Sequence, residues 1–441
     1  MKISNWNSTE SCDPTRVVVP RDAGHLIDIV KGTDTEPSPS PVRAVGSLHS
    51  LNPCFTTTGT LVQMKTDAFT YIREPVNGSV TVGAGVTMFK LKEALKRHGL
   101  QIAVTPEIGN ATAGSVACCG TKDASLKNGP GQISSTVIGA RIVDATGTER
   151  AVGAAELKAF RSSYGLLGVV HEVTFETCPL QTVDYAAESL DITGLTFARA
   201  LGSSDGFLGF FFPYHGKFVV ERRTLKPGAK PTIFDDAKRG TRNHIWKTGG
   251  APFSDIPDWF DVEFEKVFPL LSFVSDRVDV MIDFPQGGDH FFDFGFWAFP
   301  LHTWNTAIPA YVDFCQSFHG TTGFRPALPT EVYHIKRDDK ALLSFSANED
   351  IFTLDMVHVV HLAPGWEQDL ELWHQMNDEF NQRIALKFGA RPLLNQTKRL
   401  SKAVVTGALG ADWATFVDLR AKADPGLNPR FLSDYFARLG A

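Results

Sequence analysis

Residues 44–54 read AVGSLHSLNPC, in which a Gly-Ser turn follows a short apolar segment that predicts a buried strand. A turn of this kind presents several backbone N–H groups in a row, and such a row can hold a pyrophosphate. Ser47 and Ser50 add hydroxyl donors, and His49 lies between them. The stretch is therefore a candidate pyrophosphate site, with a polar turn and an incidental histidine as the alternative on these residues alone.

A second stretch, TPEIGNATAGSVACCGTK at residues 105–122, consists largely of small residues. Small side chains let the backbone approach a flat or phosphorylated ligand closely. A close-packed loop inside the core is the alternative. The vicinal pair Cys118-Cys119 has neither a CxxC spacing nor a histidine cluster beside it, so we expect no metal site.

The segment VGAGVTM at residues 82–88 contains half of a dinucleotide-binding fingerprint. Met88 stands where the third glycine of G-x-G-x-x-G is required, and no acidic residue is convincingly placed about 20 positions further on. The segment therefore predicts a tight turn between a strand and a helix that Thr87 caps, and not an NAD site.

Composition narrows the classes of function. The 441 residues exceed the usual size of one domain, and 43% hydrophobic with 21% charged residues is typical of an ordinary folded protein. A net charge of −6 argues against nonspecific binding to nucleic acid or to an anionic membrane. No apolar run approaches the ~18 residues of a spanning helix, and no signal peptide is found at the start. With six scattered cysteines, we expect a cytoplasmic protein with reduced thiols.

The chain consists of two regions of different composition and a C-terminal segment. Residues 1–180 predict an α+β unit of short strands and amphipathic helices. In residues 181–399 Phe and Trp concentrate, and we expect an antiparallel sheet with helices on one face. Residues 400–441 predict two helices around a DPGLNP turn, which we expect to pack back on the first region.

Three segments of the second region carry more specific predictions. The Pro- and Gly-rich stretch 226–257 predicts a long surface loop or lid, and SFVSDRVDVM at 272–281 has a helix-like pattern. In the strand PTEVY at 329–333, Glu331 and Tyr333 lie two positions apart and so face the same way. A pair on the surface of the sheet is the alternative.

Six segments, in order along most of the chain, resemble the FAD-binding oxidoreductases of the vanillyl-alcohol oxidase and p-cresol methylhydroxylase type. They are an opening at 5–30, VGSLHS at 45–50, GSVTVGAGVTMFKLKEALKRHGL at 78–100, PEIGNATAGSVACCGT at 106–121, GPGQISSTVIGARIVDATG at 129–147 and YGLLGVVHEVTFET at 164–177. Aldonolactone and alditol oxidases look most similar. The resemblance implies an α+β, two-domain, PCMH-type FAD-binding fold with a separate antiparallel-sheet substrate domain: 1–180 with 400–441 for FAD, and 181–399 for substrate.

The resemblance also implies which residues hold FAD. The pyrophosphate would lie on the backbone of a loop made of Gly46, Ser47, Leu48, His49 and Ser50. The isoalloxazine and ribityl side would be lined by Gly109, Thr112, Gly114 and Ser115, with Gly120 at the end of the same loop. The adenine would contact Val169 and Val170. His49 matches the histidine that many members, though not all, bond covalently to the flavin.

Departures from the family pattern concentrate on the substrate side. Counterparts of its C-terminal motifs are PTEVY, GARPLLNQTK at 389–398 and DPGLNPRFLSDYF at 424–436. Tyr333 replaces an arginine, Leu393-Leu394 replaces His-Trp, and Gln396 replaces a lysine, with Lys398 two residues further on. In the FAD half, Leu48 replaces a glycine and Lys122 a histidine. The loss of polar groups predicts a substrate less polar than a sugar lactone.

From these residues we predict an FAD-dependent oxidoreductase that oxidises an alcohol carbon and is reoxidised by O2 or another acceptor. Its candidate catalytic residues are Glu331, Tyr333, Gln396 and Lys398, and its only expected partners are a small-molecule substrate and the electron acceptor. Three alternatives stay open: oxidative cyclisation or dehydrogenation in secondary metabolism, oxidation of a sugar lactone or alditol, and an FAD-binding protein without turnover.

Overall fold

The computed structural model describes residues 2–127, 129–248, 257–283, 291–360 and 367–441. The first 180 residues form two adjoining sheets, of which the smaller is parallel and the larger antiparallel. The parallel sheet has the order β3 (Arg16–Val18), β5 (Thr60–Gln63), β4 (Val42–Val45), and the antiparallel sheet β6 (Ser79–Gly83), β10 (Val169–Glu176), β8 (Val137–Val143), β9 (Glu149–Ala151). The helices are α1 (Ala23–Lys31), α2 (Met88–Lys96), α3 (Ala113–Cys118) and α4 (Leu157–Phe160).

Local sequence signals explain where the first two helices begin. The Asp22 side chain accepts a hydrogen bond from the backbone N–H of His25 at the start of α1. The Thr87 hydroxyl does the same for Lys90 at the start of α2, which confirms the predicted cap. Such caps satisfy N–H groups that have no partner inside the helix. The turn before α2 meets the start of α3, where the Gly114 N–H donates to the Ala84 carbonyl at 2.8 Å.

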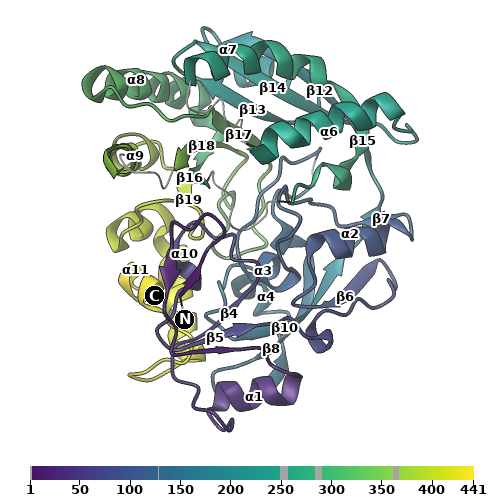
Figure 1. The fold of residues 1–441 in the computed structure, drawn as a ribbon, viewed down its shortest axis with the longest axis vertical. Coiled ribbons are helices and arrows are strands. Elements are labelled where there is room, and N and C mark those ends of the chain that lie inside the picture. Colours follow the sequence, from purple (N-terminus) through teal and green to yellow (C-terminus); the bar gives the residue numbers. More distant parts are fainter. Residues whose placement is uncertain (1, 128, 249–256, 284–290, 361–366) are drawn as a thin grey trace.

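One antiparallel sheet of eight strands dominates residues 181–399 (Figure 1). Its order is β15 (Phe273–Asp276), β12 (Thr182–Asp191), β14 (Lys217–Leu225), β13 (Gly206–Phe212), β17 (Thr330–Ile335), β18 (Ile351–Val360), β16 (Phe291–Pro300), β19 (Arg391–Pro392). Four short strands form two further pairs: β1 (Ile3–Ser4) pairs with β2 (Ser11–Cys12), and β7 (Leu100–Gln101) pairs with β11 (Cys178–Pro179).

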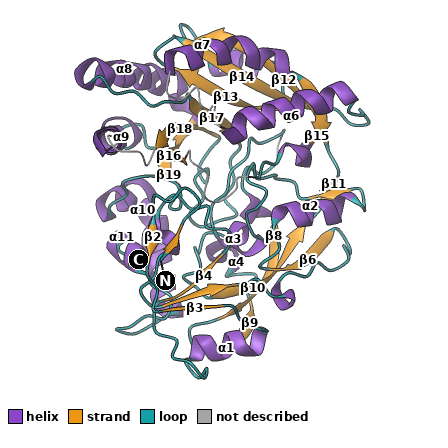
Figure 2. Ribbon diagram, viewed as in Figure 1, coloured by secondary structure: helices purple, strands orange, loops and turns teal. Residues whose placement is uncertain are grey.

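Helices cover both faces of this sheet, so the prediction of helices on one face is wrong (Figures 1 and 2). One face packs on α8 (Trp304–Thr322) and α9 (Glu367–Phe380), with the short α5 (Phe197–Leu201) beside them. The other face packs on α7 (Pro257–Val267) and α6 (Ile233–Thr248). The reason lies in strands that are apolar on both faces: in β13, Phe211 joins the α8 side and Phe210 the α7 side.

Two other predictions for this region are also wrong. Residues 233–248, predicted as loop, form α6, which starts where the Thr232 hydroxyl accepts from the Asp235 N–H; 249–256 lie outside the described residues. Residues 273–276, predicted as helix-like, form strand β15 on the edge of the sheet. The Asp235 carboxylate accepts a hydrogen bond from the Val274 N–H, so α6 and β15 stabilise each other. A contact between residues so far apart in sequence leaves no signal in the local pattern of either segment.

The C-terminal helices α10 (Lys402–Ala423) and α11 (Asp434–Leu439) pack on residues of the first 180, and both termini lie on the same side (Figure 1). Tyr164 and Leu166 share a core with Trp413 and Phe436. This arrangement agrees with the predicted return of the tail, and the domain boundaries at 180 and 400 stay predictions.

A buried ionic network joins the 105–122 loop and its flank to the large sheet. Arg223 on β14 contacts Glu221 at 2.9 Å and Asp123 at 2.8 Å. Arg277 reaches the second oxygen of Asp123 at 2.7 Å, and Arg242 on α6 reaches Glu221 at 2.9 Å. All five side chains are at least 95% buried. Each charge therefore depends on its neighbours for compensation.

We expect Arg223→Ala to lower the free energy of unfolding by about 3–5 kcal/mol, because it leaves buried carboxylates unpaired. Arg141→Ala is the control: its exposed side chain pairs with Glu149 on the neighbouring strand β9, so the loss of stability is expected to be about 1 kcal/mol or less. Urea unfolding measures both. Equal losses would contradict a structural role of the network.

Candidate active site

A cavity of roughly 840 Å³ lies between residues of the first 180 and the α6–α7 face of the large sheet. Its size is near the upper end for small-molecule and cofactor sites. Its walls come from the loop after β4, the 105–122 loop, the segment that enters β10, and strands β13, β17 and β16. Both stretches singled out in the sequence, 44–54 and 105–122, therefore line one space.

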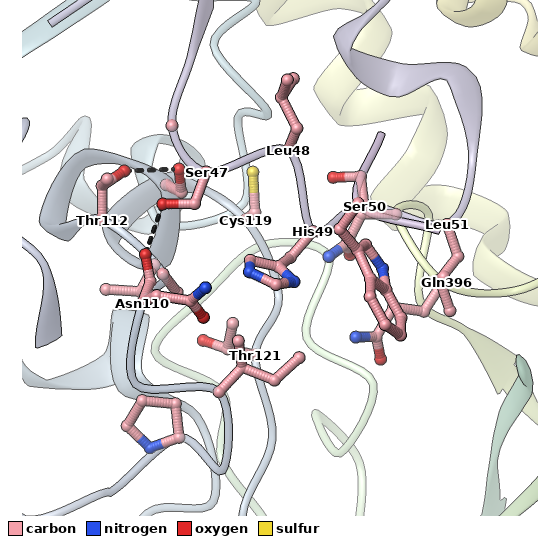
Figure 3. A pocket seen from close by; sticks show the side chains of 18 of the residues that line it. Ser47, Leu48, His49, Ser50, Leu51, Asn110, Thr112, Cys119, Thr121 and Gln396 are labelled. Atoms are coloured by element: carbon pink, nitrogen blue, oxygen red, sulfur yellow. Dashed lines mark hydrogen bonds between the residues drawn. The ribbon is translucent and has the colours of Figure 1, made fainter. Parts of the chain in front are cut away.

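The loop after β4 has no room for side chains at its first turn. A Cβ at Gly46 would lie 2.2 Å from the Thr112 hydroxyl and 2.3 Å from the Ser115 hydroxyl. These two hydroxyls contact each other at 2.9 Å, and the Ser47 hydroxyl donates to the Asn110 carbonyl (Figure 3). The two stretches are thus clamped together at the point where the backbone must approach a ligand.

Leu48 takes the backbone shape that a glycine would prefer. Its φ is 57°, in the left-handed region where a side chain costs about 1 kcal/mol or more. Leu48 therefore adopts a backbone conformation that glycine adopts without this cost. The Leu48 side chain points away from His49, and Trp6 holds the turn by donating its backbone N–H to the Leu48 carbonyl at 3.0 Å (Figure 3).

His49 projects into the cavity and is kept neutral there (Figure 3). Burial lowers the pKa of its imidazole to about 4, against a smaller raising effect of the Asn110 side chain. The Trp6 ring lies 5.6 Å from the imidazole, centroid to centroid. Neither ring nitrogen makes a hydrogen bond of ordinary geometry with the described residues. A neutral imidazole with free capacity is suited to contact a bound group.

The residues present fit a flavin nucleotide. The Thr121 hydroxyl and the Asn395 side-chain oxygen are buried at the cavity without a hydrogen-bond partner among the described residues. Unsatisfied buried polar atoms are costly, and a polar ligand would satisfy them. Gly114 lies in the first turn of α3, and a Cβ there would lie 2.9 Å from that of Ala84, so the start of this helix is also held close to the end of β6. A polar, flat cofactor with a phosphate end matches both features.

A cluster of ionisable groups lies at the sheet end of the cavity. The Tyr333 hydroxyl lies 3.2 Å from a Glu331 oxygen and 3.1 Å from a Glu107 oxygen. The Lys122 ammonium pairs with Asp355 and lies 4.3 Å from the centre of the Tyr333 ring. The hydroxyl carries a single proton, so it can donate to only one carboxyl at a time. The cluster is therefore arranged to hold or move protons.

Burial sets the proton affinity of this cluster. Burial raises the pKa of the Glu331 carboxyl to about 7. The nearby Lys122 ammonium lowers this pKa, and the Glu107 carboxylate raises it. Burial also lowers the pKa of Lys122 to about 8, against the raising effect of Glu331 and Glu107. An acid and a base with pKa values near neutrality in one cavity are typical of a catalytic site.

Apolar side chains form the rest of this end. They come from β13, α6, α7, β16, the segment before β17, and β18: Phe210, Ile245, Phe260, Phe264, Phe294, Leu328 and Val357. Some of the phenylalanines that concentrate in residues 181–399 therefore line the cavity, and others form the core on the α8 side of the sheet.

The structure brings most predicted site residues to this cavity. Those that line it are Gly46, Ser47, Leu48, His49, Ser50, Thr112, Gly114, Ser115, Val170, Glu331, Tyr333 and Gln396. Val169 is in the core beside them. Gly109 packs on the Phe89 ring and Gly120 on Leu393, where a Cβ would come within 2.5 Å and 2.0 Å, so both glycines are explained by packing.

Lys398 does not line the cavity, contrary to expectation. Its ammonium contacts Asp293 at 2.8 Å and donates to the Leu51 carbonyl at 2.5 Å. A buried lysine engaged in this way holds the chain in place. We therefore do not propose a catalytic role for it.

Three residues of the site were missed in the sequence. Lys122 was noted only as a departure from the family's histidine, and no role in the site was predicted for Glu107 or Asp355. Asp355 is entirely buried on β18, directly opposite Glu331. The sequence signal that could have found it is a carboxylate inside an apolar alternating strand, which needs a cation nearby.

Comparisons with known proteins agree with this geometry. Residues 14–153 match the family model of the FAD binding domain. L-gulono-1,4-lactone dehydrogenase of Mycobacterium tuberculosis is 28% identical over 56% of this chain and 59% of its own length. D-arabinono-1,4-lactone oxidase of Candida albicans is 25% identical over 50% of this chain and 42% of its own length. The chain thus spans about half the length of these curated relatives.

Solved structures show the same fold over the whole chain. A solvent-stable cholesterol oxidase superposes with a TM-score of 0.72 at 17% identity, covering 100% of this chain and 97% of the other. The cholesterol oxidase from B. sterolicum gives 0.72 at 15% identity, covering 99% and 96%. These matches confirm the PCMH-type FAD-binding fold, FAD as the cofactor, and the resemblance to FAD-linked oxidoreductases.

No helix in the described part of the chain has both the length and the apolar character to cross a membrane. Within the same residues, no group of three His, Cys, Asp or Glu side chains could hold a metal ion.

We expect Gly46→Ala to weaken FAD binding roughly tenfold or more, since a Cβ there collides with two hydroxyls of the facing loop. Gly407→Ala, on the exposed side of α10 with open space around it, is the control and should bind FAD as the unaltered protein does. Flavin absorbance retained after gel filtration, and titration of the apoprotein with FAD, measure the difference. Equal affinities would show that the clamp does not shape the cofactor site.

Proposed function

We propose that this chain, which carries an FAD-binding domain, is a flavin-dependent oxidoreductase that oxidises the alcohol carbon of a fairly apolar small molecule. When bound, FAD supplies the two-electron acceptor at N5 for a hydride from that carbon, and O2 or another acceptor then takes the electrons. The protein has to hold the cofactor, place the alcohol and accept its hydroxyl proton.

One observation carries the proposal: Glu331 and Tyr333 meet in the same cavity as the FAD-binding loops. They project from one strand, are both buried, and contact each other at 3.2 Å. A carboxyl with a pKa near 7 is suited to take a proton at neutral pH. Glu331 is thus the proposed base, and the Tyr333 hydroxyl orients the carboxyl or the substrate oxygen.

The proposed roles on the cofactor side follow the same logic. Backbone groups of residues 46–50 would hold the pyrophosphate, because that turn is open to the cavity and free of bulk at Gly46. Thr112 and Ser115 would face the ribityl side, and Val170 the adenine. Gln396 reaches the cavity from the C-terminal motif (Figure 3), where its amide would be able to contact the flavin edge.

The apolar walls support a substrate with few polar groups. The polar atoms at the sheet end are already engaged with one another: Lys122 with Asp355, and Tyr333 with Glu331 and Glu107. A polyol placed there would bury hydroxyls opposite phenylalanine rings, and each unpaired hydroxyl would cost roughly 1–3 kcal/mol. An alcohol on a bulky apolar skeleton would not incur this cost.

Oxidation of a sugar lactone is the second candidate. It is favoured by the names of the relatives, which are lactone dehydrogenases and oxidases. The two candidates differ in the polarity of the compound that reduces the flavin.

A substrate screen tests the proposal. Under anaerobic conditions, we expect apolar secondary or aromatic alcohols to bleach the visible absorbance of the flavin faster than polyols and sugar lactones do. If lactones or polyols are the fastest, the inference of an apolar substrate is wrong. If no alcohol or lactone bleaches the flavin, the proposed reaction is wrong.

Glu331→Gln should slow flavin reduction by the best alcohol about 10²–10⁴-fold, because no other carboxylate is held on the same strand to accept the proton. The exposed Glu188 provides the control, and Glu188→Gln should leave the rate unchanged. Stopped-flow absorbance measures both. A loss of less than threefold in Glu331→Gln would remove this residue from the reaction.

We also propose that His49 is bonded covalently to the flavin. The support is its place after β4, its projection into the cavity and its neutral, uncommitted imidazole. The intact mass of the denatured protein should then exceed that of the polypeptide by one FAD, and His49→Ala should release the cofactor on denaturation. A bare polypeptide mass, with FAD free in the supernatant, refutes the link.

A further inference from the structure

The cation at the sheet end of the cavity comes from the FAD half. Lys122 follows directly on Gly120-Thr121, and its side chain is only 12% exposed. The ammonium pairs with Asp355 on β18 and lies over two rings, 4.3 Å from the centre of Tyr333 and 4.9 Å from that of Phe296. Ring faces and one carboxylate thus hold this charge in a fixed place.

Two buried carboxylates oppose each other at this point of the sheet. Glu331 on β17 and Asp355 on β18 are direct partners in the antiparallel ladder, and both are buried. Like charges directly opposite each other destabilise a sheet, and burial makes the repulsion stronger. The arrangement therefore requires a positive charge from outside the sheet, and Lys122 is the lysine that meets Asp355.

We propose that Lys122 is the positioning residue of the site: held by Asp355, its ammonium keeps Glu331 in the carboxylate form that accepts the substrate's hydroxyl proton. The inference rests on the proposed function. In the step, the O–H bond breaks and its proton goes to Glu331, while the carbon gives up a hydride to the bound FAD, so that the C–O bond becomes C=O. Lys122 keeps its own protons throughout.

Other charged groups around Glu331 do not replace Lys122. Tyr333 carries no charge and favours the carboxylate of Glu331 only through its hydrogen bond, with less influence than Lys122, and Glu107 opposes ionisation of Glu331. Arg242, on α6, also favours the carboxylate of Glu331, but its guanidinium is engaged with Glu221 at 2.9 Å and Glu107 at 3.4 Å. After burial, Lys122 has the largest influence on the pKa of Glu331, and it lowers it. Loss of the ammonium should therefore raise that pKa.

A purely structural lysine would behave differently. If Lys122 only neutralised Asp355, its removal would destabilise the protein and slow the reaction equally at every pH. If it acts through Glu331, removal moves the protonation of Glu331 to higher pH. The position of the midpoint on the pH axis distinguishes the two roles.

The test follows the carboxyl of Glu331 by infrared difference spectroscopy on the FAD-loaded protein. Subtraction of the matching Glu331→Gln protein isolates the band, and no substrate is needed. We expect the midpoint to rise by about one pH unit or more in Lys122→Gln, a tenfold change in proton affinity or greater. It should stay in place in Lys122→Arg. The control Lys387→Gln removes a lysine that also lies over a ring, 5.4 Å from Phe388, at the surface; it should not move the midpoint.

A second pair of variants covers a failure of Lys122→Gln to fold. Asp355→Asn keeps the lysine, and the double variant Asp355→Asn/Lys122→Gln removes both charges, so neither leaves an unpaired carboxylate at position 355. The midpoint should be higher in the double variant than in Asp355→Asn. Equal midpoints in this pair, or in Lys122→Gln and the unaltered protein, overturn the inference.

Flavin reduction by an alcohol provides the second readout. In Lys122→Gln the acidic limb of the rate profile should move upward with the midpoint, so that the rate falls tenfold or more at pH 6 and much less at pH 9. If the midpoint moves but no alcohol reduces the unaltered protein, the proposed function fails and the effect of Lys122 on Glu331 is upheld. If alcohols reduce the protein and the midpoint stays, the inference fails and the proposed function stands.

Discussion

The ion pairs between Arg223 and its two carboxylates determine how the halves of this protein meet. Asp123 follows the 105–122 loop, whereas Glu221 and Arg223 belong to the large sheet. None of these charges is tolerable in a protein interior unless the others are in place. The sheet and the loop are therefore held in one relative position. That position also brings Glu107, Lys122 and Glu331 to the same cavity, so the site depends on the network beside it.

The strained turn at Leu48 shows a second dependence. A left-handed leucine persists only where its surroundings hold it. Here the N-terminal hairpin holds it: the backbone N–H of Trp6 donates to the Leu48 carbonyl, and the Asn5 side chain donates to the Ser50 carbonyl, both at 3.0 Å. The Asn7 side chain, in the same N-terminal segment, donates to the Phe292 carbonyl on the large sheet at 2.7 Å. The first residues of the chain thus support the cofactor loop and connect it with the substrate side.

How much of this could be predicted from the sequence depends on how local each feature is. The turn at Gly46, the cap at Thr87 and the strand that holds Glu331 and Tyr333 are set by residues close in sequence, and they were predicted. The placement of Lys122 against Asp355 depends on a contact between residues 233 positions apart. Helix α6 and strand β15 stabilise each other through Asp235 and Val274, so neither could be assigned alone. Because several strands are apolar on both faces, their sequence pattern does not indicate whether helices cover one face of the sheet or both.

The proton affinities of Glu331 and Lys122 determine how the site would respond when a substrate gives up its hydroxyl proton. With pKa values of about 7 for Glu331 and about 8 for Lys122, Glu331 can take up or release a proton near neutrality while Lys122 stays mostly protonated. A proton arriving at Glu331 removes its repulsion with Asp355 and leaves the ion pair of Lys122 intact. The net charge of these three groups then rises from minus one to zero, which a cavity with apolar walls favours. Acceptance of a proton therefore relieves an electrostatic cost that the folded sheet imposes, and this argues that Glu331 serves as a base rather than as a structural carboxylate.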